Sequence, residues 1–523
     1  MTAEETRAPL PTSAWYIDLV DEAATVSLAG LVAGMVRPGD LLTLSGDLGS
    51  GKTTFARALI RALTQEPELE VPSPTYTLIQ VYESTAPGAL KFPIVHADLF
   101  RIKEASELAE LGWDEAAEGA LVLVEWPERA GDSLTGDRLD IAFRIDAEKG
   151  GEFRTAALTG TGTFASRLAY QKGVHDILEQ SGFQNATRTF MLGDASTRTY
   201  ERLTKPDGTT AVLMFFPPRP DGPPVRFGKS YSEIAHLAEN IRPFIAVDNA
   251  LRGLGLSAPA ILAHDVSTGF AVIEDLGSEP LTSNDGPIFA RYAEAAAVLA
   301  KLHASERPRA IPGAAGDTYT IPLYDSEALT IEVELLLDWY VPHIAQATPA
   351  SGVKSDFSDL WRDLFADITA TTPTWTLRDY HSPNLIWLDG REGTARVGLI
   401  DFQDCVMGHP AYDVASLLQD ARVTVPADLE LKLLGLYAKL RRSLDPSFDM
   451  VEFARAYAVL GAQRATKILG IFARLDKRDR KPQYLVHLPR IQTYLKKNLA
   501  HPVLAELKTW YETNLPGVLA PPP

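Results

Sequence analysis

The glycine-rich run from Gly46 to Thr53 limits the fold of this chain more than any other feature of its sequence. It reads Gly-Asp-Leu-Gly-Ser-Gly-Lys-Thr and matches the pattern G-x-x-x-x-G-K-[ST]. A short apolar run at residues 41–44 precedes it, and residues 54–63 repeat apolar side chains at helical spacing. This order predicts a buried strand, a phosphate-binding loop and a helix, the unit from which layered α/β folds are built.

Each residue type in the run suits a task in phosphate binding. Glycines let backbone N–H groups turn toward phosphate oxygens, Lys52 reaches the β- and γ-phosphates, and Thr53 offers its hydroxyl to Mg²⁺. The helix that follows directs its positive N-terminus at the phosphates. The alternative is a glycine-rich helix start with no ligand. We predict that the nucleotide contacts are made by Gly46, Gly49, Ser50, Gly51, Lys52, Thr53 and Thr54.

A loop of this kind also needs an acid at the end of a neighbouring strand, to hold the metal ion or orient water. Asp98 follows the apolar-rich residues 94–97, and Glu125 follows the apolar run 121–124. Either acid could instead form a surface salt bridge. We predict that Thr53, Asp98 and Glu125 make up the metal site of this part of the chain, with Glu125 also acting in catalysis.

The length of 523 residues is too great for one ordinary domain. Strand-like and helix-like segments alternate as far as two glycine-rich stretches near residues 150 and 160, and the pattern then changes. We therefore predict an α/β P-loop NTPase domain over residues 1–162. Residues 163–523 then form a second, α+β domain.

The second domain divides again by pattern. Its N-terminal lobe, at about residues 170–275, contains strand-like residues 187–216 around the turn Pro206-Asp207-Gly208 and a helical pattern at 231–256. Helical patterns dominate the C-terminal lobe, at about residues 280–515.

Charge and composition exclude several classes of function. Residues 1–162 hold 13 Lys and Arg against 26 Asp and Glu, so the first domain repels phosphate backbones; we expect a protein partner and no direct grip on nucleic acid. No apolar stretch reaches the roughly 18 residues of a membrane helix, and the first 13 residues lack the apolar core of a secretion signal. The single Cys405 excludes an intramolecular disulfide and fits a reducing cytosol, so we expect a cytoplasmic protein without membrane association.

A second constellation of acids lies within the second domain. Asn384 stands five residues after Asp379, and Asp401 closes an apolar run 17 residues after Asn384. Phosphoryl transfer needs one acceptor for the hydroxyl proton and oxygen ligands for Mg²⁺. Asp379 suits the first task, and Asn384 and Asp401 suit the second. The alternative is a pair of ordinary turns, which Asp, Asn, Ser and Pro favour.

Three further motifs stand in order behind the P-loop: SPTYTL at residues 73–78, HADLFR at 96–101 and EWPE at 125–128. Together with the P-loop they resemble the TsaE family, the small ATPases of the bacterial machinery that makes threonylcarbamoyladenosine in tRNA. The resemblance covers about residues 15–160. It implies that Lys52 and Thr53 bind ATP and Mg²⁺.

The same resemblance implies further roles. Asp98 and Glu125 would assist the metal and hydrolysis, and residues 73–78 would form a switch-like loop near the nucleotide. The implied partners are the two proteins of the threonylcarbamoyl-transfer step, while the ATPase itself does not transfer the group. Phe100 stands where the family usually has Tyr.

Four phrases of the second domain, at residues 193–200, 212–214, 378–384 and 400–404, resemble the aminoglycoside-phosphotransferase and choline-kinase superfamily. The nearest branch is its cell-wall sugar kinase branch, AmgK, which phosphorylates the anomeric hydroxyl of N-acetylmuramate and N-acetylglucosamine. The resemblance covers about residues 170–480. It implies a bilobal protein-kinase-like (aminoglycoside phosphotransferase) fold, ATP and Mg²⁺ as cofactors, and an amino-sugar substrate.

This second resemblance also implies nucleotide contacts. A turn carrying Ser196 and Arg198 would cover the phosphates, and the backbone around Asp275 would meet adenine. Met214 stands where a Lys usually pairs with the phosphates; either Arg198 or another cation replaces that Lys, or this branch works without it. Asp248 is a candidate for the helix acid that usually pairs with that Lys. Arg378 stands, with Leu377, where a His is common.

The two sets of motifs together predict a bifunctional enzyme. An ATPase that supports tRNA threonylcarbamoylation is fused to a kinase that makes an amino-sugar 1-phosphate during cell-wall recycling. One alternative is a different acceptor for the kinase, such as an aminoglycoside, a choline-like alcohol or homoserine, because the acids are shared across the superfamily. Another is that the first domain acts as an ATP-gated assembly switch.

Overall fold

The computed structural model describes residues 13–83, 92–104, 107–110, 113–134, 136–146, 148–150, 153–191, 198–220, 222–348 and 352–519. It divides into two compact units, Met1–Asp176 (unit 1) and Ile177–Pro523 (unit 2), which we describe separately. The chain passes from unit 1 to unit 2 within helix α5 (Thr163–Ser181), in which Phe164 and Leu168 belong to the core of unit 1. In the described residues, no helix is long and apolar enough to cross a membrane.

Unit 1 contains one seven-stranded sheet. Its strands are β1 (Ser13–Leu19), β2 (Leu41–Ser45), β3 (Ile79–Tyr82), β4 (Ile94–Asp98), β5 (Leu121–Glu125), β6 (Arg138–Ile145) and β7 (Arg154–Gly160). Its helices before α5 are α1 (Glu22–Ala33), α2 (Lys52–Thr64), α3 (Glu107–Glu110), α4 (Trp113–Ala117) and the 3₁₀ segment η1 (Pro127–Ser133).

The order of the strands is β1-β7-β6-β2-β5-β4-β3, and the four central strands β6, β2, β5 and β4 run parallel. Both faces of the sheet are covered. In β5, Leu121 and Leu123 pack in the core that includes α1 and α2, whereas Val122 and Val124 pack in the core on the other face. A strand covered on both faces must be apolar throughout, which explains the unbroken apolar run.

The register of the sheet places the predicted residues of the first site at one edge. The glycine-rich loop leaves the carboxyl end of β2 and enters α2. Leu44 of β2 lies beside Glu125 of β5, and Asp98 of β4 lies on the other side of Glu125. The loop and both acids therefore meet where ligands bind in parallel α/β sheets.

Unit 2 begins with a five-stranded antiparallel sheet in the order β13-β14-β10-β9-β8. The strands and helices of this lobe are β8 (Thr187–Met191), β9 (Thr199–Thr204), β10 (Thr210–Phe215), β11 (Pro224–Arg226), β12 (Lys229–Ser230), α6 (Tyr231–Ile234), α7 (Arg242–Gly253), β13 (Ile261–Asp265) and β14 (Phe270–Glu274). The turn predicted at Pro206-Asp207-Gly208 is confirmed, because Lys205 N donates to Thr209 O across it at 2.9 Å. The helical pattern at 231–256 holds two helices, α6 and α7, instead of one.

The remainder of unit 2 is mainly helical. Its elements are β15 (Thr282–Ser283), β16 (Gly286–Pro287), α8 (Phe289–Leu302), β17 (Ala310–Pro312), β18 (Thr318–Thr320), α9 (Ser326–Leu335), η2 (Leu336–Tyr340), α10 (Val341–His343), α11 (Val353–Thr369), β19 (Thr374–Thr376), η3 (Ser382–Asn384), β20 (Leu385–Trp387), η4 (Gly393–Arg396), β21 (Val397–Leu399), β22 (Val406–Gly408), α12 (Ala411–Leu418), α13 (Ala427–Leu444), α14 (Met450–Asp479), η5 (Pro482–His487), α15 (Leu488–Asn498), η6 (Pro502–Leu504), α16 (Ala505–Asn514) and α17 (Pro516–Leu519).

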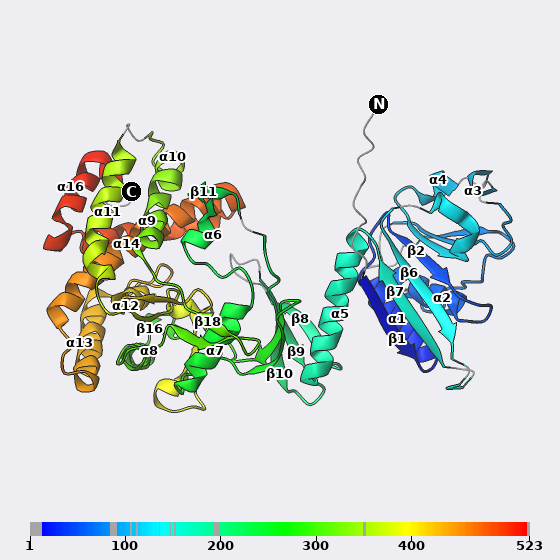
Figure 1. Ribbon diagram of the computed structural model, residues 1–523, viewed down its shortest axis with the longest axis horizontal. Helices are drawn as coiled ribbons and strands as arrows, with labels where there is room; N and C mark the ends of the chain where they lie inside the picture. The colour runs from blue at the N-terminus through cyan, green and yellow to red at the C-terminus, as the bar shows by residue number, and fades with distance from the viewer. Residues whose placement is uncertain are drawn as a thin grey trace. The chain divides into compact units, whose positions relative to one another are not determined.

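Helix α14 is the centre of this lobe and contacts α9, α12 and α15 (Figure 1). Gly470 of α14 packs tightly against Leu335, because an added Cβ there would lie 2.4 Å from the Leu335 backbone carbon. Only glycine permits that spacing, since real Cβ contacts are longer. The close packing fixes the face of α14 that lines the second site.

Candidate active sites

The first site is built around the glycine-rich loop between β2 and α2. Gly46 has φ 131°, and an added Cβ would lie 2.3 Å from the carbonyl oxygen of Phe143, so no other residue fits there. Gly51 has φ 107° and directly precedes α2, which begins at Lys52. The Ser50 hydroxyl is buried and has no hydrogen-bond partner among the described residues. This loop has the backbone form and the spare donor that phosphate binding requires.

Lys52 lies folded into the loop. Its Nζ donates to the carbonyl oxygens of Gly46 at 2.7 Å and Asp47 at 2.9 Å, and it lies 3.9 Å from the centre of the Trp126 ring. Burial lowers the pKa of Lys52, and the carboxylates of Glu125, Glu128, Asp98 and Asp47 oppose that shift. Trp126 belongs to the EWPE phrase, but the sequence did not predict that its ring would lie beside Lys52.

The two predicted acids have different surroundings. Thr53 Oγ1 donates to Glu125 Oε2 at 2.9 Å, and the other carboxylate oxygen of Glu125 lies 3.0 Å from His96 Nε2. The structure therefore brings Thr53 and Glu125 together, as a metal site needs. Sequence reasoning assigned no role to His96. Its position on a buried strand, two residues before Asp98, was the signal that could have identified it as part of the site.

Asp98 instead holds the segment that follows α2. Its Oδ2 accepts hydrogen bonds from Ser73 Oγ at 2.7 Å and Thr75 Oγ1 at 2.6 Å, while Oδ1 accepts from Phe100 N at 3.0 Å. Strand β4 carries this carboxylate, and the SPTYTL phrase at residues 73–78 supplies the two hydroxyl groups that donate to it. Thr54 lies in the first turn of α2, as the motif predicts.

The second site is centred on the loop between β19 and η3. Arg378 has φ 67°, and its strained backbone is held by α12. Asp413 of α12 accepts the backbone N–H groups of Leu377 at 2.7 Å and Arg378 at 2.9 Å, and Ser416 Oγ donates to Arg378 O at 3.1 Å. These bonds fix the direction in which Asp379 leaves the loop.

Arg378 stands where members of the superfamily commonly have a His, and its side chain stabilises the loop. Its guanidinium is buried, donates to the carbonyl oxygen of Ala235 at 2.9 Å and forms an ion pair with Glu332 of α9. Burial would raise the pKa of Glu332, but the cations Lys467 and Arg378 outweigh it and hold that pKa at about 2. The buried pair therefore ties the loop to α6 and α9.

The acids predicted from spacing are brought together. Asn384 Nδ2 donates to the carbonyl oxygen of Asp379 at 3.0 Å and to Asp401 Oδ2 at 3.2 Å, and Gln403 Nε2 donates to Asp401 Oδ1 at 3.1 Å. Arg198 Nη2 donates to the same Oδ1 at 2.5 Å. Burial alone would raise the pKa of Asp401, but the Arg198 charge and the hydrogen bonds from Gln403 and Arg198 lower it. Asp401 is therefore held as a charged carboxylate beside Arg198.

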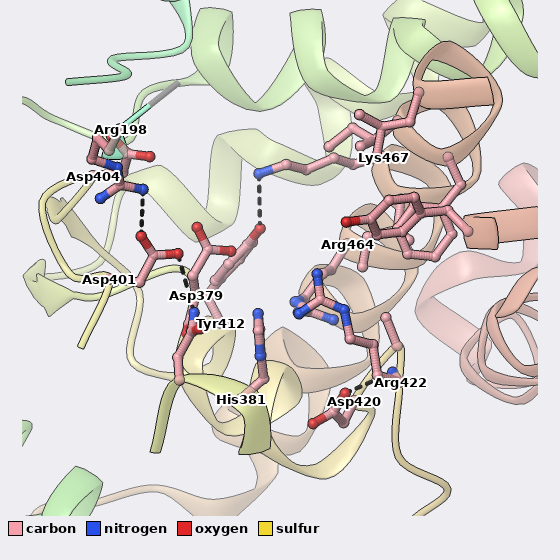
Figure 2. A pocket seen from close by; sticks show the side chains of 17 residues that line it. Arg198, Asp379, His381, Asp401, Asp404, Tyr412, Asp420, Arg422, Arg464 and Lys467 are labelled. Atoms are coloured by element: carbon pink, nitrogen blue, oxygen red, sulfur yellow. Dashed lines mark hydrogen bonds and ion pairs between the residues drawn. The ribbon is translucent and has the colours of Figure 1, made fainter. Parts of the chain in front are cut away.

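These residues line a cavity of about 310 Å³ (Figure 2). One end holds Arg198, Asp379, Asn384, Asp401 and Asp404. Helix α14, η5 and the segment after α12 form the rest of its wall, through Asp420, Arg422, Arg464, Lys467, Ile468, Ile471, Phe472, Leu475 and Tyr484. Sequence reasoning missed this second group, because the residues come from helices with no recognisable motif.

The other predicted nucleotide residues of unit 2 have mixed positions. Ser196 lies outside the described residues. Asp275 does not line the cavity; its carboxylate accepts from Arg202 Nε at 2.8 Å and from Gly277 N at 3.0 Å. Met214 is buried on β10. The guanidinium groups of Arg198 and Arg219 lie 5.5 Å and 5.6 Å from the centre of the Phe216 ring, so both cations flank that ring. Burial and the Arg198 charge lower the pKa of Arg219.

Asp248 lies on α7, where the acidic partner of the usual Lys was expected. It is fully buried, and neither carboxylate oxygen has a hydrogen-bond partner in the described part of the chain. Burial is the main cause that raises the pKa of Asp248 to about 8; Glu274 adds to the rise and Arg252 opposes it. With Met214 on the strand, Asp248 is a neutral core residue at pH 7.

Both sites offer oxygen ligands suited to Mg²⁺. Among the described residues, no group of three or more His, Cys, Asp or Glu side chains is arranged to hold a metal ion. Mg²⁺ is usually held by one or two protein oxygens and completed by phosphate oxygens and water. Thr53 with Glu125, and Asn384 with Asp401, meet that requirement.

Comparisons with known proteins match the two units to two families. Residues 19–154 match the model for threonylcarbamoyl adenosine biosynthesis protein TsaE, and residues 187–446 match the model for the phosphotransferase enzyme family. An N-acetylmuramate/N-acetylglucosamine kinase of Caulobacter vibrioides is 37% identical over 354 residues, covering 65% of this chain and 95% of the relative.

Two further relatives agree with this division. An N-acetylmuramate/N-acetylglucosamine kinase of Pseudomonas aeruginosa is 32% identical over 331 residues, covering 60% of this chain and 84% of the relative. A tRNA threonylcarbamoyladenosine biosynthesis protein TsaE of Rickettsia felis is 38% identical over 127 residues, covering 24% of this chain and 71% of the relative.

Proposed function

The chain belongs to the TsaE family in its N-terminal part and to the phosphotransferase family, with the N-acetylmuramate/N-acetylglucosamine kinases, in its C-terminal part; from this premise we propose a bifunctional cytoplasmic enzyme. Unit 2 uses Mg-ATP to phosphorylate the anomeric hydroxyl of N-acetylmuramate and N-acetylglucosamine in cell-wall recycling. Unit 1 is an ATPase that supports the threonylcarbamoyladenosine modification of tRNA, acting through the proteins of the transfer complex.

The observation that carries the kinase proposal is the assembly of Asp379, Asn384 and Asp401 at one end of a single cavity. Asp379 accepts the proton of the sugar hydroxyl, and Asn384 and Asp401 hold Mg²⁺. ATP supplies the phosphoryl group. Arg198, beside Asp401, supplies positive charge for the phosphates in place of the missing strand Lys, and Arg219 lies close enough to share that task.

The charge of the cavity bears on the acceptor. Arg422 and Arg464 line the end away from Asp401. A cationic acceptor such as an aminoglycoside or choline would be repelled there, whereas a neutral or acidic sugar would not. The apolar side chains of Ile468 and Phe472 and the ring of Tyr484 offer the non-polar faces that a sugar ring packs against.

An acceptor panel tests this assignment. The full chain is incubated with Mg-ATP and N-acetylmuramate, N-acetylglucosamine, kanamycin, choline or homoserine, and products are followed by mass, with Asp379→Ala as the blank. We expect a phosphosugar from the first two only. Its phosphate should be lost readily in acid, since it is attached at the anomeric carbon. A product from kanamycin, choline or homoserine alone would reassign the acceptor.

In unit 1, Lys52 and the loop backbone bind the phosphates, and Thr53 and Glu125 hold Mg²⁺. Glu125, positioned by His96, is also the residue we assign to hydrolysis. ADP release by the full chain without sugar, compared between wild type and Lys52→Ala, tests this assignment. Equal rates would remove the N-terminal ATPase from the proposal.

A specific observation favours an ATP-gated switch as a second role of unit 1. Ser73 and Thr75 donate to Asp98, an acid that also lies beside Glu125 in the sheet. A metal ion that drew on Asp98 would compete with these hydroxyls and release the segment. Hydrolysis should then be slow until the partner proteins of the transfer complex are added. Fast hydrolysis that the partners do not change would contradict a switch.

A further inference from the structure

The kinase cavity contains a buried cation that forms no ion pair among the described residues. Arg464 of α14 is 5% exposed, and its guanidinium makes one hydrogen bond in the described part of the chain, from Nη1 to the carbonyl oxygen of Gln419 at 3.3 Å. None of the described carboxylates forms an ion pair with it. Buried charges in proteins are normally paired, because removing a charge from water is costly unless a partner compensates for it.

The neighbouring cations differ from Arg464 in this respect. Lys467, one turn further along α14, pairs with Glu332 at 2.7 Å, and Arg198 pairs with Asp401 at 2.5 Å. Asp420, the acid nearest in sequence to Arg422 in the cavity wall, binds backbone N–H groups. It accepts from Arg422 N at 2.7 Å and Ser382 N at 2.9 Å. The charge of Arg464 is therefore left for a ligand.

Figure 2 shows where that ligand would lie. The guanidinium groups of Arg464 and Arg422 converge beside His381, and Asp401 lies on the opposite side of Asp379. The anion site is thus distinct from the metal end of the cavity.

We propose that Arg464 binds a carboxylate of the acceptor sugar and thereby sets the preference between the two sugars. N-acetylmuramate carries a lactyl carboxylate, and N-acetylglucosamine differs by lacking it. A guanidinium suits this task because it offers two parallel N–H donors to a carboxylate. This inference rests on the proposed kinase function, since it assumes that the acceptor hydroxyl lies at Asp379 while the carboxylate lies at Arg464.

The test compares binding of an acid with binding of its neutral ester. Calorimetric titrations of N-acetylmuramate and its methyl ester are made with the wild-type full chain and with Arg464→Met. We expect the wild type to bind the acid about 10- to 100-fold more tightly than the ester, the worth of one charged hydrogen-bonded pair. The variant should bind the two equally, and Arg464→Lys should restore part of the difference.

A matched control uses the same helix. Arg455→Met removes an exposed arginine of α14 that pairs with Asp367, and should leave the acid-to-ester ratio at the wild-type value. In kinase assays, Arg464→Met should lower the ratio of kcat/KM for N-acetylmuramate to that for N-acetylglucosamine by about 10-fold or more. The effect should appear mainly in KM.

Several results would overturn the inference. If the wild type binds the acid and the ester equally, the proposed carboxylate site is wrong. This result does not depend on whether Arg464→Met folds. An equal loss for both sugars, with a raised KM for ATP, would assign Arg464 to the phosphate instead. If the wild type phosphorylates neither sugar but still prefers the acid in an Arg464-dependent way, the proposed kinase function fails and the carboxylate site remains.

Discussion

The two proposed phosphate sites of this chain are built in different ways. In unit 1, eight consecutive residues form the loop, and the strand and helix on either side of it present the loop backbone to the ligand. In unit 2, Arg198, Asp379, Asp401 and Arg464 come from four separate elements spread over most of the unit. Local backbone form makes the first site, and tertiary packing makes the second. Substitutions should therefore act through different causes in the two units.

The largest expected effect tests whether the sites are independent. Asp379→Asn removes the proton acceptor of unit 2 and should lower sugar phosphorylation about 10²- to 10⁴-fold, the usual contribution of a general base. ADP release without sugar should be unchanged, because unit 1 does not use this residue. Phosphosugar formation by mass and ADP release are measured on the same protein. A parallel fall in both rates would show that the units are coupled.

The next effect concerns the packing that holds the catalytic loop. Asp413→Ala leaves the backbone N–H groups of Leu377 and Arg378 buried without their acceptor. We expect unit 2 to lose about 2–4 kcal/mol of unfolding free energy and kcat to fall more than KM changes. Urea unfolding with Asp428→Ala, an exposed residue of α13, is the control. A stable variant with normal kcat would contradict a supporting role for α12.

The corresponding change in unit 1 is smaller. Lys52→Ala removes a charged donor but leaves the backbone of the loop intact, so the affinity of unit 1 for ATP should fall about 10- to 100-fold without loss of stability. Sugar phosphorylation should be unchanged. Lys149→Ala, an exposed residue of the same unit, is the control for both readouts. Weakened folding of unit 1 would show that its site depends on side-chain contacts after all.

The smallest effect is a pH dependence that should be confined to unit 2. The pKa of Asp248 is raised to about 8 by burial, so folding takes up a proton and stability falls as pH rises from about 4 to 8. Asp248→Asn lacks this loss, and its advantage over the wild type should grow by at most about 1.4 kcal/mol per pH unit in that range. Urea unfolding at pH 5, 6 and 7 measures it, and a constant difference would contradict a neutral Asp248.

The same contrast explains how well each site could be predicted. The glycine-rich loop, its adjoining strand and helix, and the turn at residues 206–208 lie where the sequence predicts them, because short runs determine their backbone conformations. Spacing also led to Asp379, Asn384 and Asp401, which the hydrogen bonds of Asn384 join, and their roles stay predictions. The sequence predicted that Asp98 and Glu125 each end a strand, and the sheet register adds that the two strands are adjacent and parallel.

Contacts between distant segments could not be read in this way. The Arg198–Asp401 pair joins residues 203 positions apart, and the burial of Arg378 against Glu332 depends on α9. The expectation that the backbone around Asp275 meets adenine comes from the family resemblance and stays a prediction. The carboxylate of Asp275 binds Arg202 of β9, a pairing that joins segments far apart in the sequence.

The sequence by itself determined the two fold families and the residues proposed for phosphate binding and phosphoryl transfer, because each depends on residue types at short, regular intervals. Only the tertiary structure decided which side chains surround those acids. Helix α14 turns Arg464 into the cavity and pairs Lys467 with Glu332, although both cations lie on the same helix. Burial and pairing of a charge are set by every element packed around it, and no interval along the chain records that arrangement.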